Sequence, residues 1–518
     1  MSTWISRVKD NLLGYKEESL DSPRFLAYLL GFSVLVALSL ILTSPWRTLA
    51  VIGGLGAVAV GFTRPRLLVL FLAVYTPFEP FLLKFVPDEL YLYARYGSES
   101  LIYLLLAVVA ARVILGGQRR VVTPLDLPFI GFLVVAAASL VINSVDLTFG
   151  LLGLRQIIRF MLLFFAVVQL DFGPKFIKRL TAMLLAVMVF QAGLGVFQAV
   201  MGGSVDEFLI PSERKFYESI QLTSGTDQFW SPGTRVFATM GRYDQLGTFL
   251  CFFMLIAVGL YYVRRGTNEP ESKKLWFMAA CSGPALILTM SRASWFGFLL
   301  GLFLIGALVM KDWRVKFVYG AAILAAILYL SWSGLVVRYL IDTPEQTTVE
   351  RLFEAFSYER WRGEYYGLGR LYWMVQTPLK VVPYSPVLGV GPGQYGAGAA
   401  AALGNTRIYD KLGLPFGVYG SEGYIDNNWF AIWGETGTLG LFFYGWMVWA
   451  LALIGWRTYR SAKSAFLRGL SLGYVGAVLA VTFQAFLATY LEVRTLALYL
   501  WLFGALIYSW ARRDKIFG

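Results

Sequence analysis

The chain has no histidine among its 518 residues, and this absence excludes several kinds of chemistry. Without an imidazole there is no histidine general base, no histidine metal ligand and no Ser-His-Asp triad. Only two cysteines occur, Cys251 and Cys281, and both lie inside apolar runs. The sequence therefore predicts neither a disulfide framework nor a zinc site.

Charged residues are also scarce. They make up 15% of the chain against 57% in the hydrophobic class, and the mean hydropathy is +0.62. A soluble globular chain carries about 25% charged residues. The formal net charge of +13 would suggest a nucleic-acid partner in a soluble protein, but here the placement of the charges matters more than their sum. The composition predicts an all-α polytopic membrane protein with no nucleic-acid partner.

Apolar stretches long enough to cross about 30 Å of hydrocarbon recur along the whole chain. We predict about fourteen transmembrane helices (twelve to fourteen), of which 48–63 and 275–290 are the shortest. Their ranges are 25–44, 48–63, 67–85, 98–115, 127–143, 155–171, 180–200, 245–263, 275–290, 293–310, 317–336, 438–456, 469–488 and 495–511.

The positions of Lys and Arg predict the orientation of these helices. With a cytoplasmic N-terminus, 26 of the 45 basic residues fall in inside segments and only seven in short outside segments. Residues 1–24 are polar and mixed in charge, so no cleavable signal peptide is predicted. We expect 1–24 and 512–518 to be cytoplasmic.

Two long loops separate the predicted helices into three groups. The groups are 25–200, 245–336 and 438–511, and the loops are 201–244 and 337–437. Both loops fall on the external side, and we expect the larger one to be the catalytic loop.

An amphipathic helix is predicted over 365–382 in the larger loop. Its apolar stripe is Leu368, Leu371, Tyr372, Val375, Leu379 and Val382. Arg370 would then lie on the opposite face, beside Trp373 and Thr377. That face is either solvated or closes over a cleft with Arg370 aimed into it.

Polar residues gather where the smaller loop enters the next helix. Arg235, Arg242 and Asp244 are expected at the external membrane surface. They are either interfacial groups, with Arg242 and Asp244 as a local ion pair, or ligands of a substrate. Arg155, Arg159 and Arg292 are further cations at external helix ends.

A third group of polar residues precedes the twelfth predicted helix. Asp426 or Asn427 is expected to be the N-cap of a helix that continues into 438–456. Glu435 lies close to the membrane boundary, where an unpaired carboxylate is costly, and shares a helical face with Asn428. The nearby Gly389–Gly393 segment is either a simple turn or a donor of backbone N–H groups to phosphate.

These residue types together suggest one kind of chemistry. The planar guanidinium of arginine makes paired hydrogen bonds to phosphate and stays charged. Aromatic rings such as that of Trp373 suit the C–H faces of sugars, and a carboxylate suits removal of a proton from a sugar hydroxyl. The combination predicts glycosyl transfer from a lipid-linked diphosphate donor.

Four segments resemble motifs of the O-antigen ligase family. Asp426-Asn427, followed after nine residues by Gly437-x-x-Gly440, is similar to the family's His-Asn motif. The other three segments are Arg235–Gly247, Leu288–Trp295, and Gly369-Arg370 followed by Pro386–Gly393. Together they extend from about 230 to 445, in the family's order and at matching membrane depth.

This resemblance implies a membrane glycosyltransferase with a GT-C-like helical bundle and an active site on the periplasmic side of the bacterial inner membrane. By position, Arg235 and Arg370 would hold the diphosphate, and Asp426 would stand in place of the ligase histidine. The remaining expected substrate-binding residues are Arg242, Asp244, Arg292, Trp373, Asn427 and Asn428, and Glu435 is the reserve base. Because Asp-Asn replaces His-Asn, the resemblance favours the O-antigen or exopolysaccharide polymerases over the ligases.

The resemblance also names the partners. These are an undecaprenyl-diphosphate-linked glycan as donor, a glycan or lipid A-core as acceptor, membrane lipids, and a protein that regulates chain length. No metal or other cofactor is expected, since guanidinium groups would stabilise the leaving diphosphate. A lipid or polysaccharide transporter is the alternative from another class, although the internal repeats or broken helices typical of transporters are not evident.

Overall fold

The computed structural model describes residues 44–211, 216–217, 220–221, 234–265, 270–340, 346–416 and 425–517. The first predicted membrane segment, 25–44, and the predicted cytoplasmic N-terminus therefore lie almost entirely outside the described residues. Phe229, Trp230 and Tyr424, three of the loop aromatics, lie outside them as well.

The described chain is almost entirely helical, which confirms the predicted all-α membrane fold. The N-terminal part contains α3 (Pro45–Thr63), α4 (Pro65–Tyr75), α5 (Glu79–Leu82), η1 (Leu83–Phe85), α6 (Asp88–Ile114), α7 (Asp126–Ile142), α8 (Leu147–Leu170), α9 (Pro174–Met201) and α10 (Gly203–Leu209). A hairpin of two-residue strands, β1 (Phe216–Tyr217) and β2 (Ile220–Gln221), follows.

The central part contains η3 (Ala238–Met240), α11 (Tyr243–Arg265), α12 (Pro270–Leu288), α13 (Arg292–Leu302), the π-helix η4 (Phe303–Val309) and α14 (Trp313–Arg338). The larger loop contains α15 (Thr348–Phe353), η5 (Glu354–Phe356), α16 (Tyr358–Tyr366), α17 (Arg370–Gln376), the π-helix η6 (Thr377–Val381), α18 (Val382–Tyr384), α19 (Ala397–Ala402) and α20 (Arg407–Leu412). The chain ends with α21 (Asn428–Ser461), α22 (Ala465–Gln484) and α23 (Arg494–Arg513).

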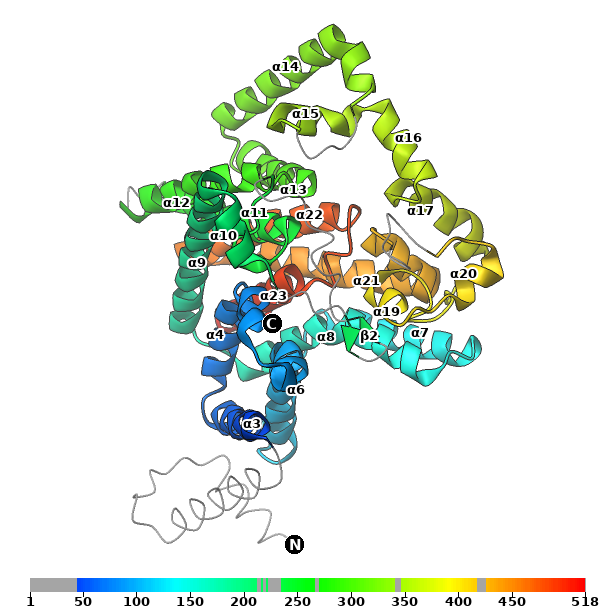
Figure 1. Cartoon of the computed structure of the whole chain (residues 1–518). Coiled ribbons are helices and arrows are strands. Elements are labelled where there is room, and N and C mark those ends of the chain that lie inside the picture. Colours follow the sequence, from blue (N-terminus) through cyan, green and yellow to red (C-terminus); the bar gives the residue numbers. More distant parts are fainter. Residues whose placement is uncertain are drawn as a thin grey trace, which may run out of the picture.

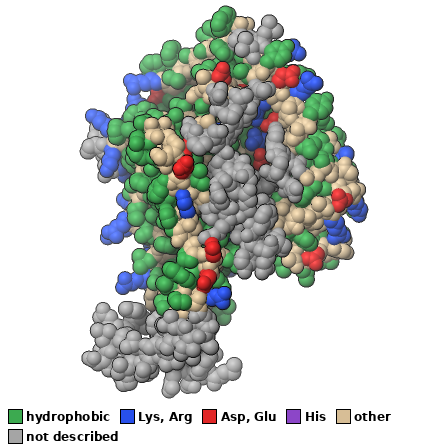
Figure 2. Space-filling model, in the orientation of Figure 1, with side chains coloured by type: hydrophobic (Ala, Val, Ile, Leu, Met, Phe, Trp, Pro, Cys, Tyr) green, Lys and Arg blue, Asp and Glu red, His purple; other side chains and the backbone are tan. Residues whose placement is uncertain are grey.

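Thirteen of the fourteen predicted membrane segments overlap these helices, but the prediction of one helix over 67–85 is wrong, because this stretch is divided between α4 and the α5–η1 segment. Within the described residues, nine helices are long and apolar enough to cross a membrane. A tenth span is formed if α4 is counted with the α5–η1 segment, from which it is bent by 82°. Hydrophobic side chains cover much of the face seen in Figure 2, as expected for a surface in contact with lipid.

The core of the bundle lies around α11, whose membrane window is 83% buried. Figure 1 shows α11, α22 and α23 at the centre, with α3, α4 and α6 below them. Small residues let α11 and α22 approach closely, because a Cβ at Gly259 would overlap the backbone of Gly473. Such contacts are typical of helix packing in membranes, where dispersion replaces the hydrophobic effect.

The larger loop forms an arm that returns to the bundle. In Figure 1, α14 stands at the top, apart from the central helices, and α15, α16 and α17 lead from it to α19 and α20 beside α21 and α7. The apolar window within Trp313–Trp332 of α14 contains no buried residue. The arm therefore connects the end of α14 with the start of α21, and the polar residues of the larger loop lie along it.

Candidate functional site

Asp426 lies just before Asn427, the residue that precedes α21, and it does not cap this helix. Asn427 is the N-cap: its side chain accepts the Phe430 N–H at 3.1 Å and donates to the Phe486 carbonyl at 2.9 Å. Asn428 accepts the Leu491 N–H at 3.1 Å. These bonds fasten the start of α21 to the chain between α22 and α23. The two asparagines are thus anchors of this segment, and the Asp426 carboxylate remains available for other contacts.

That carboxylate faces Arg370, the first residue of α17. Their nearest atoms, Asp426 Oδ2 and Arg370 Nη2, are 3.4 Å apart. The buried Glu364 accepts the Arg370 N–H at 2.9 Å and lies 3.9 Å from its guanidinium. The chain reaches this position through Leu368, whose φ of 60° is unusual for a non-glycine residue and marks a constrained turn. Two residues far apart in sequence therefore form the centre of the site.

The start of α11 lies next to this pair. Arg242 and Asp244 form an ion pair at 3.1 Å, and the Arg235 guanidinium lies 4.3 Å from the centre of the Tyr243 ring. Arg242 and Asp244 interact electrostatically with Asp426, and Tyr243 does so with Arg370. The structure thus brings the predicted residues of the smaller and larger loops together.

The electrostatics of the pair follow from burial and neighbouring charges. Burial raises the pKa of Asp426 above its usual value of 3.8, and the effect outweighs the lowering by Arg370 and Arg242. Burial would lower the pKa of the Arg370 guanidinium, but Asp426 and Glu364 outweigh it and raise that pKa. The site thus combines a permanently charged cation with a carboxylate that binds a proton more readily than usual.

A second group of arginines extends the site toward α13. Glu354 is fully buried and contacts Arg292 and Arg351, each at 3.0 Å, and also Arg360. Arg360 reaches Glu364 as well, at 2.6 Å, and so connects this group to Arg370. Of these residues only Arg292 was predicted. The density of charges of both signs from Arg351 to Glu364 was the available signal, but sequence alone does not reveal which charges are buried.

Glu435 and the glycine-rich turn bind each other. The Glu435 carboxylate accepts the N–H groups of Gly393 at 3.0 Å and Tyr395 at 3.4 Å, and its carbonyl accepts that of Gly391 at 2.9 Å. The Val390 N–H donates to Gly434. These amides are engaged within the protein, so the structure favours the simple turn over the phosphate-binding loop. Glu435 anchors this turn.

Two predictions about the larger loop are wrong in part. The predicted helix over 365–382 is broken at Gly367–Gly369, and α17 begins only at Arg370. The buried residues of α17 and the following η6 are Trp373, Thr377 and Val381, whereas Leu379 of the predicted stripe is exposed.

Trp373 is correspondingly enclosed. Its ring is fully buried between Tyr395 and Tyr409, and its indole N–H donates to the Leu368 carbonyl at 2.9 Å. The side chain predicted to stack on sugar therefore packs inside the loop. Apolar groups of a membrane protein can also face lipid, so the periodicity alone did not reveal which side was buried.

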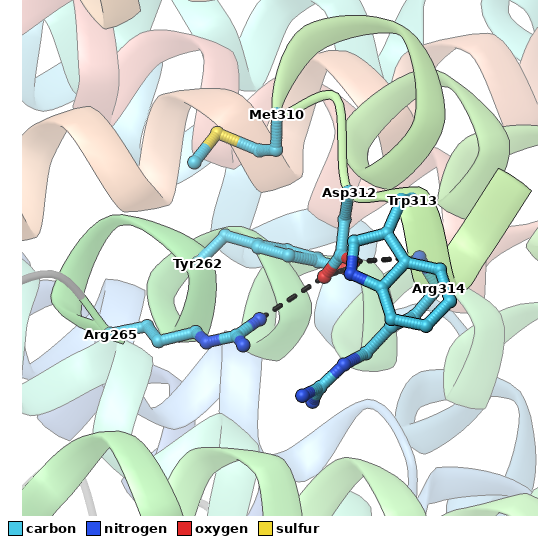
Figure 3. Close-up of a pocket in the computed structure, with 6 residues that line it drawn as sticks. All are labelled: Tyr262, Arg265, Met310, Asp312, Trp313 and Arg314. Atoms are coloured by element: carbon cyan, nitrogen blue, oxygen red, sulfur yellow. Dashed lines mark hydrogen bonds and ion pairs between the residues drawn. The ribbon is translucent and has the colours of Figure 1, made fainter.

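A cavity of about 460 Å³ lies at the far end of α11 (Figure 3). In it, Asp312 pairs with Arg265 at 3.1 Å and accepts a hydrogen bond from Tyr262 at 3.2 Å. The 23 residues of α11 place this cavity roughly 35 Å from Arg242 at 1.5 Å per residue. It is therefore separate from the arginine-rich site. Within the described residues, no group of three or more acidic or cysteine side chains could hold a metal ion.

The fold and the site together define a polytopic membrane protein with an arginine-rich polar site at one end of its helices. Residues 277–445 match the family model described as O-antigen ligase, from α12 into α21. This part of the chain thus carries the O-antigen ligase family domain, which confirms the family resemblance. The match supports a glycan-transferring membrane enzyme of the ligase or polymerase type and does not separate the two. No curated protein matches the chain.

Proposed function

We propose that this protein is a polymerase that joins undecaprenyl-diphosphate-linked oligosaccharide units by metal-independent, inverting glycosyl transfer. The observation that carries the proposal is the contact of Arg370 with Asp426, at 3.4 Å. It places a cation suited to a leaving diphosphate beside a carboxylate suited to accept a proton. Such a pair is what direct displacement at a glycosyl diphosphate requires.

The charge of the connected site supports a diphosphate ligand. Among the described residues, six arginines and four carboxylates take part, which leaves two positive charges in excess within that set. The arginines are Arg235, Arg242, Arg292, Arg351, Arg360 and Arg370, and the carboxylates are Asp244, Glu354, Glu364 and Asp426. A diphosphate diester carries two negative charges. Its binding would therefore neutralise this partly buried site.

The reaction is a single displacement. An acceptor hydroxyl oxygen attacks the anomeric carbon of the donor as the bond from that carbon to the diphosphate oxygen breaks. Asp426 takes the hydroxyl proton, and undecaprenyl diphosphate leaves with the bonding electron pair. Arg370, with Arg235 nearby, stabilises the charge that grows on the leaving group. The raised pKa of Asp426 makes this carboxylate a stronger base than an exposed aspartate.

Polymerase is favoured over ligase because the chain has no histidine and Asp426 stands where the ligase motif has one. The arrangement of Lys and Arg in the sequence supports an inner-membrane protein whose site faces the periplasm. On that side the protein would meet glycan lipids and a chain-length regulator. A ligase that uses lipid A-core as acceptor is the second candidate.

The test uses purified protein in nanodiscs, supplied with an undecaprenyl-diphosphate oligosaccharide from the host, with and without lipid A-core. We expect a ladder of product lengths and release of undecaprenyl diphosphate. Asp426→Asn should reduce the rate by about 10²–10⁴ and Arg370→Ala by about 10²–10³. Arg362→Ala is the matched control, because Arg362 lies in the same loop, is exposed and pairs only weakly with Glu359, at 3.6 Å.

Two results would contradict the proposal. A single product that forms only with lipid A-core would identify a ligase. Folded protein that yields no product from authentic substrate would favour the transporter.

A further inference from the structure

A second group of charged residues lies where α5, α6, α8 and α23 meet, outside the matched segment. Its arginines are Arg95, Arg155, Arg159 and Arg494, which interact with one another and with Glu79 and Glu99. Glu79 and Glu99 are both buried. Charges at helix ends of a membrane protein are costly to bury and commonly mark functional sites.

The contacts of Glu99 hold two of these arginines in place. Its carboxylate accepts hydrogen bonds from Arg155 at 2.8 Å, from Arg159 at 3.2 Å and from the Tyr103 hydroxyl at 2.7 Å. Arg155 also lies against the Tyr96 ring, 5.2 Å from its centre, and is the most exposed of the three arginines for which ion pairs are seen. An accessible guanidinium beside an aromatic ring could meet a ligand without leaving its present position.

Arg494 and Glu79 form the second half of the group. They make an ion pair, to which Ser98 adds a hydrogen bond on Glu79 at 3.1 Å, and Arg494 also donates to the Arg95 carbonyl at 3.3 Å. The other carboxylate oxygen of Glu79 is buried and accepts no hydrogen bond from the described residues. This buried oxygen is therefore an unsatisfied acceptor among the described residues.

Glu492 links this group to the larger loop. Its carbonyl accepts a hydrogen bond from Arg159 at 3.0 Å, and its carboxylate accepts from Gln156 and from the Gly398 N–H. Burial raises the pKa of Glu492 to about 7. One of its carboxylate oxygens also has no hydrogen-bond donor in the described part of the chain. Among the described residues of this group there are thus four arginines and three glutamates, and one of the glutamates is only partly ionised near neutral pH.

The group lies close to the proposed catalytic site. Tyr490 interacts electrostatically with Arg370, and the Leu491 N–H binds Asn428, two residues from Asp426. Arg494 follows Leu491 by three positions, a stretch that extended chain would span in about 10 Å. Both sites therefore lie at the same end of the bundle, at a separation that a short oligosaccharide can span.

We propose that Arg95, Arg155, Arg159 and Arg494 form a second diphosphate-binding site, which holds the lipid diphosphate of the acceptor glycan while its far end reacts at Asp426. This inference rests on the proposed function: a polymerase brings together two glycans, each on its own lipid diphosphate. The first diphosphate neutralises the site around Arg370, so the second requires its own cations.

The test compares two acceptors at a fixed donor concentration. One is the oligosaccharide on undecaprenyl diphosphate, and the other is the same oligosaccharide with a free reducing end. In Arg155→Gln we expect KM for the lipid-linked acceptor to rise at least tenfold, while KM for the free acceptor and for the donor stays unchanged. Lys84→Gln is the control, because Lys84 is a cation near the same helix ends that donates to the carbonyls of Glu207 and Phe208.

An equal loss with both acceptors would overturn the inference, because it would indicate a structural role for Arg155. Unchanged KM values, with weaker retention of anionic phospholipid by Arg155→Gln, would overturn it in favour of a site for bulk lipid.

The number of undecaprenyl diphosphate molecules bound per protein, measured by native mass spectrometry, tests the second site independently of activity. We expect two molecules per wild-type protein and one per Arg155→Gln protein; one for both would exclude a second site. If wild type binds two molecules but forms no product, the proposed reaction fails while the second site stands.

Discussion

At the scale of single residues, the chemistry depends on the environment of Asp426. As a general base it must be ionised, so transfer should fall as the pH drops through its pKa. Burial raises that pKa, and the loss should therefore begin at a higher pH than for an exposed aspartate. A profile of kcat/KM against pH, measured in nanodiscs, shows the pH at which this loss occurs, which is the acidic limb of the profile.

Arg242 and Asp244 shift the acidic limb of the profile in opposite directions, since Arg242 lowers the pKa of Asp426 and Asp244 raises it. The limb should move to higher pH in Arg242→Gln and to lower pH in Asp244→Asn. Movement of both variants in the same direction would indicate that another group is the base.

The residues around Asp426 also show which parts of the site could be predicted from the sequence and which could not. The family resemblance assigned Asp426 and Arg370 to one site, and the structure places them 3.4 Å apart. The same reasoning missed Glu364 and Glu354, the buried carboxylates that hold the arginines. Their contacts join segments of the larger loop and α13 whose approach depends on the path of the whole arm.

At the scale of secondary-structure elements, the important feature is the break in α21 at Gly437. Its φ of 66° interrupts the helix and lets the turn around Gly389 lie against it. A Cβ at Gly437 would overlap the carbonyl oxygen of Val387. The turn could then no longer dock beside Glu435.

Gly437→Ala should therefore destabilise the larger loop by about 1–3 kcal/mol and reduce transfer activity together with it. Gly445→Ala, on the same helix with open space around its Cα, should be neutral or stabilising by up to about 1 kcal/mol. Thermal unfolding in detergent and the transfer assay measure both. Equal effects of the two substitutions would show that the break has no special role.

At the scale of the whole molecule, the site is expected on the external side and the cavity near Asp312 on the internal side. Cysteines introduced one at a time in a Cys281→Ser background, where the remaining Cys251 is buried, test this orientation. Lys411→Cys, in the larger loop, should react with a membrane-impermeant maleimide in intact spheroplasts. Gln118→Cys, between α6 and α7, should react only after lysis. Both positions are exposed in the structure. Labelling in the reverse pattern would invert the topology and contradict a periplasmic active site.

The sequence by itself determined the membrane class and the approximate positions of most membrane helices, because the length of an apolar run is a local property. It also located the motif before α21, where capping residues act within a few positions. Tertiary structure alone decided that Trp373 packs inside the loop, that Glu435 binds backbone amides, and that Arg360 connects two buried glutamates. These outcomes depend on which surfaces meet, and in a membrane protein apolar side chains are stable against either lipid or protein. Hydrophobic pattern therefore predicts that a helix exists but not the direction in which it faces.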